Sequence, residues 1–190
     1  MVVEINAPIA ILGGGGLGSN LASTLVEQGY KDVLLIDDDT SDTKFLKRYG
    51  FFGGLQYTNI DIPKTEVIKR VVKSRLREGQ LFNVVHAKVD EQFNYQELLH
   101  KFCIITVDSI GSRETIERNL KKLDVPFIHV GCNLNSVSIF KTMDNVLGED
   151  NIAGATTSYD VVPDFVTYMA ACVEVVAHLS GSKVKIWVEE

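Results

Sequence analysis

The sequence has few cysteines and no long apolar run, and each absence removes a class of protein. Its three cysteines, Cys103, Cys132 and Cys172, stand far apart in 190 residues and form no C-x-x-C pair. A disulfide framework and a cysteine zinc site are therefore not expected, and we predict no zinc. The apolar runs are only a few residues long, far short of a membrane span, so we expect no membrane association.

Positive charge is scarce as well. Lys and Arg number 19 against 25 Asp and Glu, which gives a formal net charge of −6 and argues against a nucleic-acid partner. The stretch from Met1 to Ile5 lacks a basic segment followed by an apolar core, so no secretory signal is expected and a cytoplasmic location is the default. With 45 % hydrophobic and 23 % charged residues, the composition predicts one globular domain over residues 1–190.

What the sequence does have is a run of four glycines, residues 13–16, between an apolar run and a helical pattern. The next apolar run ends at Asp37, which lies 19 residues after Gly18. Strand, glycine turn, helix, strand and acid form the layout of a nucleotide-binding βαβ unit, in which main-chain N–H groups and a helix N-terminus receive a phosphate. A tight turn without a ligand is disfavoured, because the acid is near the roughly 20 residues expected for a ribose partner.

Strand-like and helix-like segments alternate along the rest of the chain. Strands are predicted at about 8–12, 32–36, 81–89, 102–107, 126–130, 136–142 and 183–188. Helices are predicted at about 17–28, 63–79, 95–100, 112–123 and 163–179, and a loop at 144–160. The first strands are continuous Val/Ile/Leu runs, which is typical of parallel strands covered on both faces. The pattern predicts a Rossmann-like α/β fold: a mostly parallel sheet with helices on both faces and antiparallel strands toward the C-terminus.

In such a sheet ligands bind beyond the carboxyl ends of the strands, so the polar residues there are site candidates. They include Asp37 and Asp39 after the second strand, Arg48 and Lys64 around the long connection that follows, and Asp108 after the fourth strand. Cations can neutralise phosphates and a carboxylate can hold Mg²⁺. This mixture favours a triphosphate with its metal over a dinucleotide.

The order of these residues resembles the ThiF/MoeB branch of the ubiquitin-activating-enzyme superfamily over about residues 8–182. The family motif G-x-G-G-x-G-S is matched by residues 13–19, D-x-D by 37–39, Pro-Lys by 63–64, D-x-x-x-x-R by Asp108 and Arg113, and a Gly after strand five by Gly131. In the family's Asn-x-x-Arg-Gln signature the Arg is matched by Arg48. The Asn and Gln positions hold Phe45 and Tyr49 instead.

The resemblance implies ATP- and Mg²⁺-dependent adenylation of the C-terminal carboxylate of a small ubiquitin-like or sulfur-carrier protein. The residues implied to approach the nucleotide phosphates are Gly13, Gly15, Gly16 and Gly18. Asp37 is implied to bind the ribose hydroxyls, and Arg48 and Lys64 to hold the triphosphate as catalytic residues. Asp108 is implied to coordinate Mg²⁺, with Asp39 near the metal or the phosphates.

Two alternatives stay open. Phe45 and Tyr49 replace two polar groups near the reacting phosphate, which favours a non-catalytic nucleotide-binding or scaffold module. The position of Asp37 also allows an NAD-binding oxidoreductase. The last helix, 163–179, is apolar almost all round, which is typical of a helix buried in its own core or at a subunit contact. Together with the resemblance, it predicts a homodimer.

Overall fold

Six strands form one sheet, and they are ordered β3-β2-β1-β4-β5-β6. The computed structural model describes residues 2–42, 45, 61–132, 137–143 and 165–181. The strands are β1 (Ile9–Leu12), β2 (Asp32–Asp37), β3 (Leu81–His86), β4 (Phe102–Ile105), β5 (Phe127–Cys132) and β6 (Val137–Phe140). The helices are α1 (Gly16–Glu27), α3 (Lys64–Lys73), α4 (Ile110–Lys122) and α5 (Phe165–Leu179), with a 3₁₀ turn, η3, at Tyr95–Leu98.

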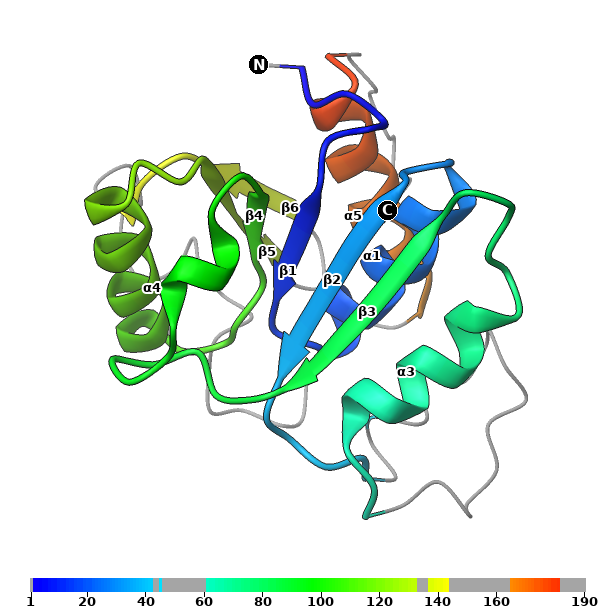
Figure 1. Ribbon diagram of the computed structural model, residues 1–190, viewed down its shortest axis with the longest axis horizontal. Helices are drawn as coiled ribbons and strands as arrows, with labels where there is room; N and C mark the ends of the chain where they lie inside the picture. The colour runs from blue at the N-terminus through cyan, green and yellow to red at the C-terminus, as the bar shows by residue number, and fades with distance from the viewer. Residues whose placement is uncertain (1, 43–44, 46–60, 133–136, 144–164, 182–190) are drawn as a thin grey trace, which may run out of the picture.

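Helices lie on both faces of the sheet (Figure 1), and each face carries a hydrophobic core. Alternate residues of β1 point to opposite faces, so Ile9 and Ile11 pack with α1, α3 and α5, whereas Ala10 and Leu12 pack with α4 and η3. Every residue of β1 is fully buried, as expected for a strand covered on both sides. The predicted Rossmann-like fold with helices on both faces is confirmed.

The strand order places the glycine turn at the switch point of the sheet. β1 pairs in parallel with β2 on one side and with β4 on the other, and β6 alone runs antiparallel, against β5. In register, Leu12 lies beside Ile36 and Ile105, so these three strands reach the same edge together. Ligands of open α/β sheets bind at such a switch point.

Two helix boundaries differ from the sequence prediction for local reasons. α3 ends at Lys73, six residues before Gly79, because Gln80 holds the following turn: its side chain donates to the carbonyl oxygens of Val26 and Tyr30. α4 begins two residues early, at Ile110, because the Ser109 hydroxyl accepts a hydrogen bond from a first-turn N–H and caps the helix.

The apolar last helix is explained by its own core. α5 packs against α1, and the buried side chains on its inner face are Tyr168, Ala171, Cys172, Val175 and Leu179. Burial within the chain therefore accounts for the inner face of this helix, while Val173 is exposed, and the homodimer stays a prediction. Across the described ranges, no helix has both the length and the apolar content of a membrane span. The predicted loop at 144–160 and strand at 183–188 lie outside the described residues.

Candidate functional site

The glycine turn joins the carboxyl end of β1 to the first turn of α1. Gly13 has a φ of +111°, a conformation that L side chains rarely adopt, and its N–H donates to the Ile36 carbonyl oxygen at 2.9 Å. A Cβ at Gly18 would lie 1.9 Å from the Gly13 carbonyl oxygen, and one at Gly16 would lie 2.5 Å from the Tyr168 ring. Close packing of α1 against the backbone of the turn thus requires glycine at position 18, whereas a side chain at position 16 would have to displace the Tyr168 ring.

Gly15 is different, because nothing in the described structure requires it to be glycine. A Cβ built there meets no atom within 4 Å, and its φ of −66° is ordinary. It is the N-cap of α1, with no side chain to satisfy the helix's free N–H groups, and the first turn of α1 carries no acidic residue. The turn is buried apart from Gly15, which is half-buried, so the partial positive charge of the helix N-terminus can be reached from solvent at Gly15.

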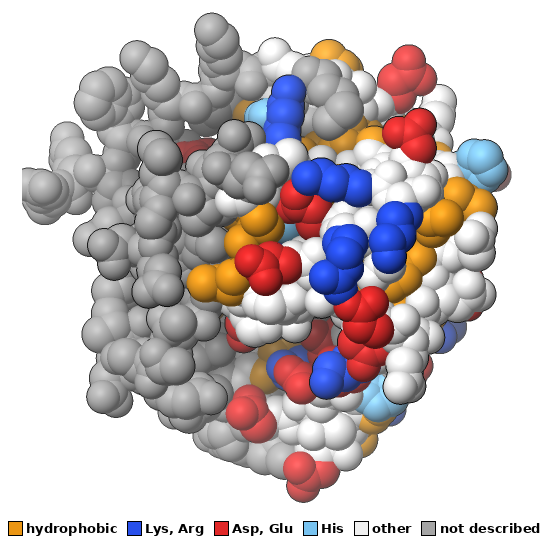
Figure 2. Space-filling model, turned by 90° about the vertical axis from the view of Figure 1, so that its left-hand side faces the viewer, with side chains coloured by type: hydrophobic (Ala, Val, Ile, Leu, Met, Phe, Trp, Pro, Cys, Tyr) orange, Lys and Arg blue, Asp and Glu red, His pale blue; other side chains and the backbone are white. Residues whose placement is uncertain are grey.

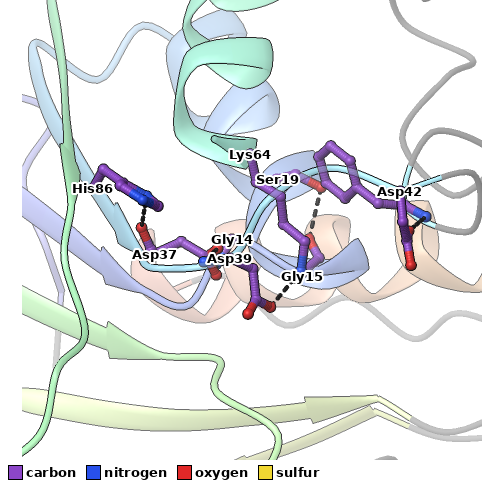
Figure 3. Close-up of polar contacts among 9 residues, drawn as sticks. Gly14, Gly15, Ser19, Asp37, Asp39, Asp42, Lys64 and His86 are labelled. Atoms are coloured by element: carbon purple, nitrogen blue, oxygen red, sulfur yellow. Dashed lines mark hydrogen bonds and ion pairs between the residues drawn. The ribbon is translucent and has the colours of Figure 1, made fainter. Parts of the chain in front are cut away.

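Asp37 ends β2 beside this turn and fixes its shape. Its Oδ2 accepts a hydrogen bond from the Gly14 N–H at 2.6 Å, and its Oδ1 accepts one from the Asp39 N–H at 3.0 Å (Figure 3). Burial raises the pKa of the Asp37 carboxyl, while the Gly14 hydrogen bond and the charge of Lys64 act against that rise. Each carboxylate oxygen can accept two hydrogen bonds, so the side chain keeps capacity for two hydroxyl donors.

Asp39 and Lys64 form an ion pair one step further along the same edge. The Lys64 Nζ lies 2.6 Å from the Asp39 Oδ2, and the Lys64 N–H donates to the Asp39 carbonyl oxygen at 2.9 Å. The Asp39 side chain is 63 % exposed and that of Lys64 only 14 %, so the pair itself contributes little stability. The ion pair instead fixes the position of the Lys64 ammonium group next to the glycine turn (Figure 3).

Backbone contacts join the two ends of the long connection between β2 and α3, and these contacts hold Lys64 in place. Thr40 and Pro63 form an antiparallel bridge, and the Ser41 N–H donates to the Ile62 carbonyl oxygen at 2.8 Å. The buried ring of Phe45 has its centroid 5.5 Å from the Lys64 Nζ, within range of a cation–π contact. Thus Phe45, which stands where the family signature has Asn, packs beneath the cation.

Asp108 follows β4 and is exposed, as a ligand-binding carboxylate requires. The N-cap of α4 is Ser109 rather than Asp108. Arg113 of the same motif is buried and donates to the Ile105 and Val130 carbonyl oxygens at 3.2 and 2.9 Å. Burial lowers the pKa of Arg113 to about 10, and the nearby charge of Asp108 opposes this shift. Arg113 therefore ties the end of β4 to the interior of β5, close enough to Asp108 to be affected by its charge.

Sequence reasoning missed two residues at this edge. The buried Thr106 hydroxyl lies 2.8 Å from the Gly13 carbonyl oxygen and 3.1 Å from that of Leu12, and it fastens the turn to β4. His86 ends β3, and its Nδ1 lies 3.2 Å from the Asp37 carbonyl oxygen. A threonine at the end of an apolar strand and a single histidine carry no spacing signal that would single them out.

The remaining predictions have separate outcomes. Arg48 and Tyr49 lie outside the described residues, so their predicted roles stay predictions. All three cysteines are buried, and burial raises the pKa of Cys132 to about 11, as expected of a packing residue rather than a reactive thiol. Among the described residues, no three His, Cys, Asp or Glu side chains gather as a metal site. A Mg²⁺ site would rest on fewer protein ligands, such as Asp108 and Asp39, completed by phosphate oxygens and water.

A hollow of about 540 Å³ lies elsewhere, on the outer side of α4 next to Met143. On this face Lys and Arg side chains are interleaved with Asp and Glu (Figure 2). Lys121 is paired with Glu117, and Arg118 with Glu91. Because these charges already neutralise one another, the hollow is a weaker anion site than the glycine turn.

Comparison with known proteins identifies the family. The family model described as "ThiF family" matches residues 5–176. The chain belongs to the ThiF family. This match covers β1 through most of α5, so it includes every described site residue.

The similar proteins are much longer than this chain. SUMO-activating enzyme subunit 2 of Dictyostelium discoideum is 28 % identical over 139 residues, which are 70 % of this chain and 20 % of that protein. The NEDD8-activating enzyme E1 catalytic subunit of Schizosaccharomyces pombe is 30 % identical over 117 residues, 60 % of this chain and 25 % of that protein. The chain thus spans a fifth to a quarter of the length of these relatives.

Solved structures share the fold. E. coli MccB with AMPCPP and MccA superposes with a TM-score of 0.71 at 17 % identity, covering 93 % of this chain and 57 % of MccB. E. coli tRNA N6-threonylcarbamoyladenosine dehydratase, TcdA, in complex with AMP gives 0.70 at 15 % identity, covering 93 % and 85 % of the two chains. Both were crystallised with an adenine nucleotide or its analogue.

Proposed function

We propose that this chain binds ATP at the glycine turn and uses it to adenylate a C-terminal carboxylate. The observation that carries the proposal is Gly15, a half-buried backbone position at a helix N-terminus with no described atom within 4 Å of where a Cβ would go. The next residue back, Gly14, is held by Asp37, and Lys64 is paired with Asp39 on the same edge of the sheet. A phosphate fits that space and finds main-chain donors there. The adenine nucleotides in the MccB and TcdA crystals support this choice of ligand.

Each residue has a role in the proposed reaction. Asp37 accepts hydrogen bonds from the ribose hydroxyls, with the free capacity left by Gly14 and Asp39. Lys64 and Arg48 neutralise the triphosphate as a carboxylate oxygen attacks the α-phosphorus and pyrophosphate leaves. Mg²⁺, held by Asp108, would supply further neutralisation of the leaving group. The protein forms no covalent bond in this step, so positioning and charge stabilisation supply the catalysis.

The proposed substrate is the C-terminus of a small ubiquitin-like or sulfur-carrier protein, or of a peptide. Support comes from the names of the similar proteins, which include SUMO-activating and NEDD8-activating enzyme subunits and MccB crystallised with MccA. We further propose that the active form is a homodimer, and sedimentation would test this directly.

Exchange of radiolabelled pyrophosphate into ATP tests the activity, with small proteins and peptides ending in Gly-Gly as acceptors. We expect exchange that needs Mg²⁺, that depends on the acceptor and that is lost in Asp108→Asn. ATP binding by calorimetry without exchange for any acceptor would favour the non-catalytic module, for which Phe45 in place of a polar residue is the supporting observation. Tight NAD binding without ATP binding would overturn the proposal in favour of an oxidoreductase.

A further inference from the structure

His86 stands at the edge of the candidate site with one ring nitrogen engaged and the other free. It is the last residue of β3 and the register partner of Asp37. Its Nδ1 lies 3.2 Å from the Asp37 carbonyl oxygen, the imidazole is exposed, and its Nε2 makes no hydrogen bond to any described residue.

The contact with Asp37 decides which nitrogen carries the proton. A carbonyl oxygen can only accept, so Nδ1 must donate, and the neutral imidazole then has an unshared pair on Nε2. His86 therefore offers a hydrogen-bond acceptor of fixed identity to whatever lies beyond Asp37. The carbonyl oxygen that His86 contacts belongs to Asp37, whose carboxylate also accepts the Gly14 N–H.

The order of the strands gives the direction in which a nucleotide would lie. The glycine turn follows β1, Asp37 ends β2 and His86 ends β3, and these strands are adjacent in that order. Figure 3 shows His86 on the far side of Asp37 from Gly15 and Lys64. With the phosphates at Gly15 and the ribose at Asp37, the group that extends toward β3 is the base.

We propose that the His86 Nε2 accepts a hydrogen bond from the exocyclic amine of the base, and so selects adenine over purines that carry an oxygen at that position. Such an oxygen would face the Nε2 lone pair with no proton between them, which leaves two acceptors unpaired. This inference rests on the proposed function, since it assumes a nucleotide at the glycine turn. His86 is a specificity residue here and takes no part in the transfer of the adenylyl group.

Binding of ATP, inosine triphosphate and 2′-deoxyATP by calorimetry tests the proposal. We expect the wild-type chain to bind ATP about tenfold more tightly than inosine triphosphate, since one hydrogen bond lost at an exposed imidazole is worth up to about 1.4 kcal/mol, a factor of ten. His86→Leu should bring this ratio close to one, and His86→Lys, which offers only donors, should reverse it. Neither variant should change the ratio between ATP and 2′-deoxyATP.

His178→Leu is the matched control. His178 is also exposed, but it lies in the last turn of α5, where the Leu179 carbonyl oxygen accepts from the Val3 N–H before β1 begins. It is therefore at the opposite end of the sheet, and its loss should leave all three affinities unchanged. Melting temperatures check that each variant is folded.

The outcomes separate the two proposals. An unchanged ratio between ATP and inosine triphosphate in both His86 variants, or a change confined to 2′-deoxyATP, would overturn the role of His86 and leave ATP binding intact. If the wild-type chain binds none of the three nucleotides, the proposed function fails and the role of His86 fails with it.

Discussion

Two glycines of the same turn should respond in opposite ways to an added side chain. At Gly15 a Cβ meets nothing within 4 Å and the φ of −66° suits any L residue, so Gly15→Val should fold. At Gly18 a Cβ would lie 1.9 Å from the Gly13 carbonyl oxygen, a main-chain atom that cannot rotate away. Gly18→Ala must push α1 from the turn by more than an ångström, and overpacking of this kind costs about 1–3 kcal/mol or more.

The expected result is a separation of stability from binding. For a chain of this size about 1 kcal/mol shifts the melting temperature by roughly 2–4 °C, so a cost of about 1–3 kcal/mol should make Gly18→Ala melt roughly 2–12 °C below wild type. Gly15→Val loses only a favourable N-cap residue, on the order of 1 kcal/mol. It should nevertheless lose ATP affinity by more than tenfold, because the isopropyl group occupies the space assigned to the phosphates.

Thermal melts by circular dichroism and ATP titrations by calorimetry measure the two effects. Gly111→Val is a suitable control, because Gly111 also has open space around its Cβ position but lies on the exposed surface of α4. Wild-type ATP affinity in Gly15→Val would refute the assignment of the phosphate site. A melting temperature for Gly15→Val as low as that of Gly18→Ala would refute the claim that the position is open.

Two further predictions concern buried charged and titratable groups. Arg113→Met should cost about 3 kcal/mol in urea unfolding, because two buried carbonyl oxygens lose a charged donor; an unchanged unfolding midpoint would show that Arg113 does not tie β4 to β5. His129 is fully buried beside Glu117, and burial lowers its pKa from 6.5 to about 4. The folded state thus favours the neutral ring. The stability that depends on keeping His129 neutral is fully present above pH 6.5, and the free energy of unfolding falls by up to about 3 kcal/mol as the pH drops to 4. His129→Gln should make unfolding free energy less pH-dependent in this window, and an equally steep acid loss in the variant would contradict the assignment.

The sequence was sufficient for those parts of the site that depend on hydrophobic pattern. Continuous apolar runs identified β1, β2 and β4, and parallel strands bring their carboxyl ends to one edge, so the grouping of Asp37 with the glycine turn could be predicted. The pairing of Asp39 with Lys64 could not, because it depends on how the long connection is fastened at Thr40 and Pro63.

Other features depended on tertiary contacts that leave no periodic trace. The end of α3 is set by Gln80, whose side-chain amide donates to a carbonyl oxygen of α1. The apolar pattern alone would continue the helix beyond its last residue, Lys73. From the sequence, Arg113 is expected to be an exposed helical charge or part of a family motif. In the structure it is buried and donates to a main-chain carbonyl oxygen. Thr106 and His86 act through main-chain oxygens of neighbouring strands, which only the sheet order brings within reach.

The balance of charge along this edge supports ATP with Mg²⁺ over a dinucleotide without metal. Asp37, Asp39 and Asp108 each follow a strand that ends there, and Lys64 is already paired with Asp39. Among the described residues, this set of carboxylates leaves a triphosphate arriving alone little net attraction beyond the helix N-terminus. A divalent cation shared between carboxylate and phosphate oxygens converts that repulsion into binding, and it frees Lys64 to turn from Asp39 to the phosphates. The acidic edge is therefore consistent with a ligand that brings its own metal. The glycine turn would then contact the phosphates, and the carboxylates would contact the metal bound to the same phosphates.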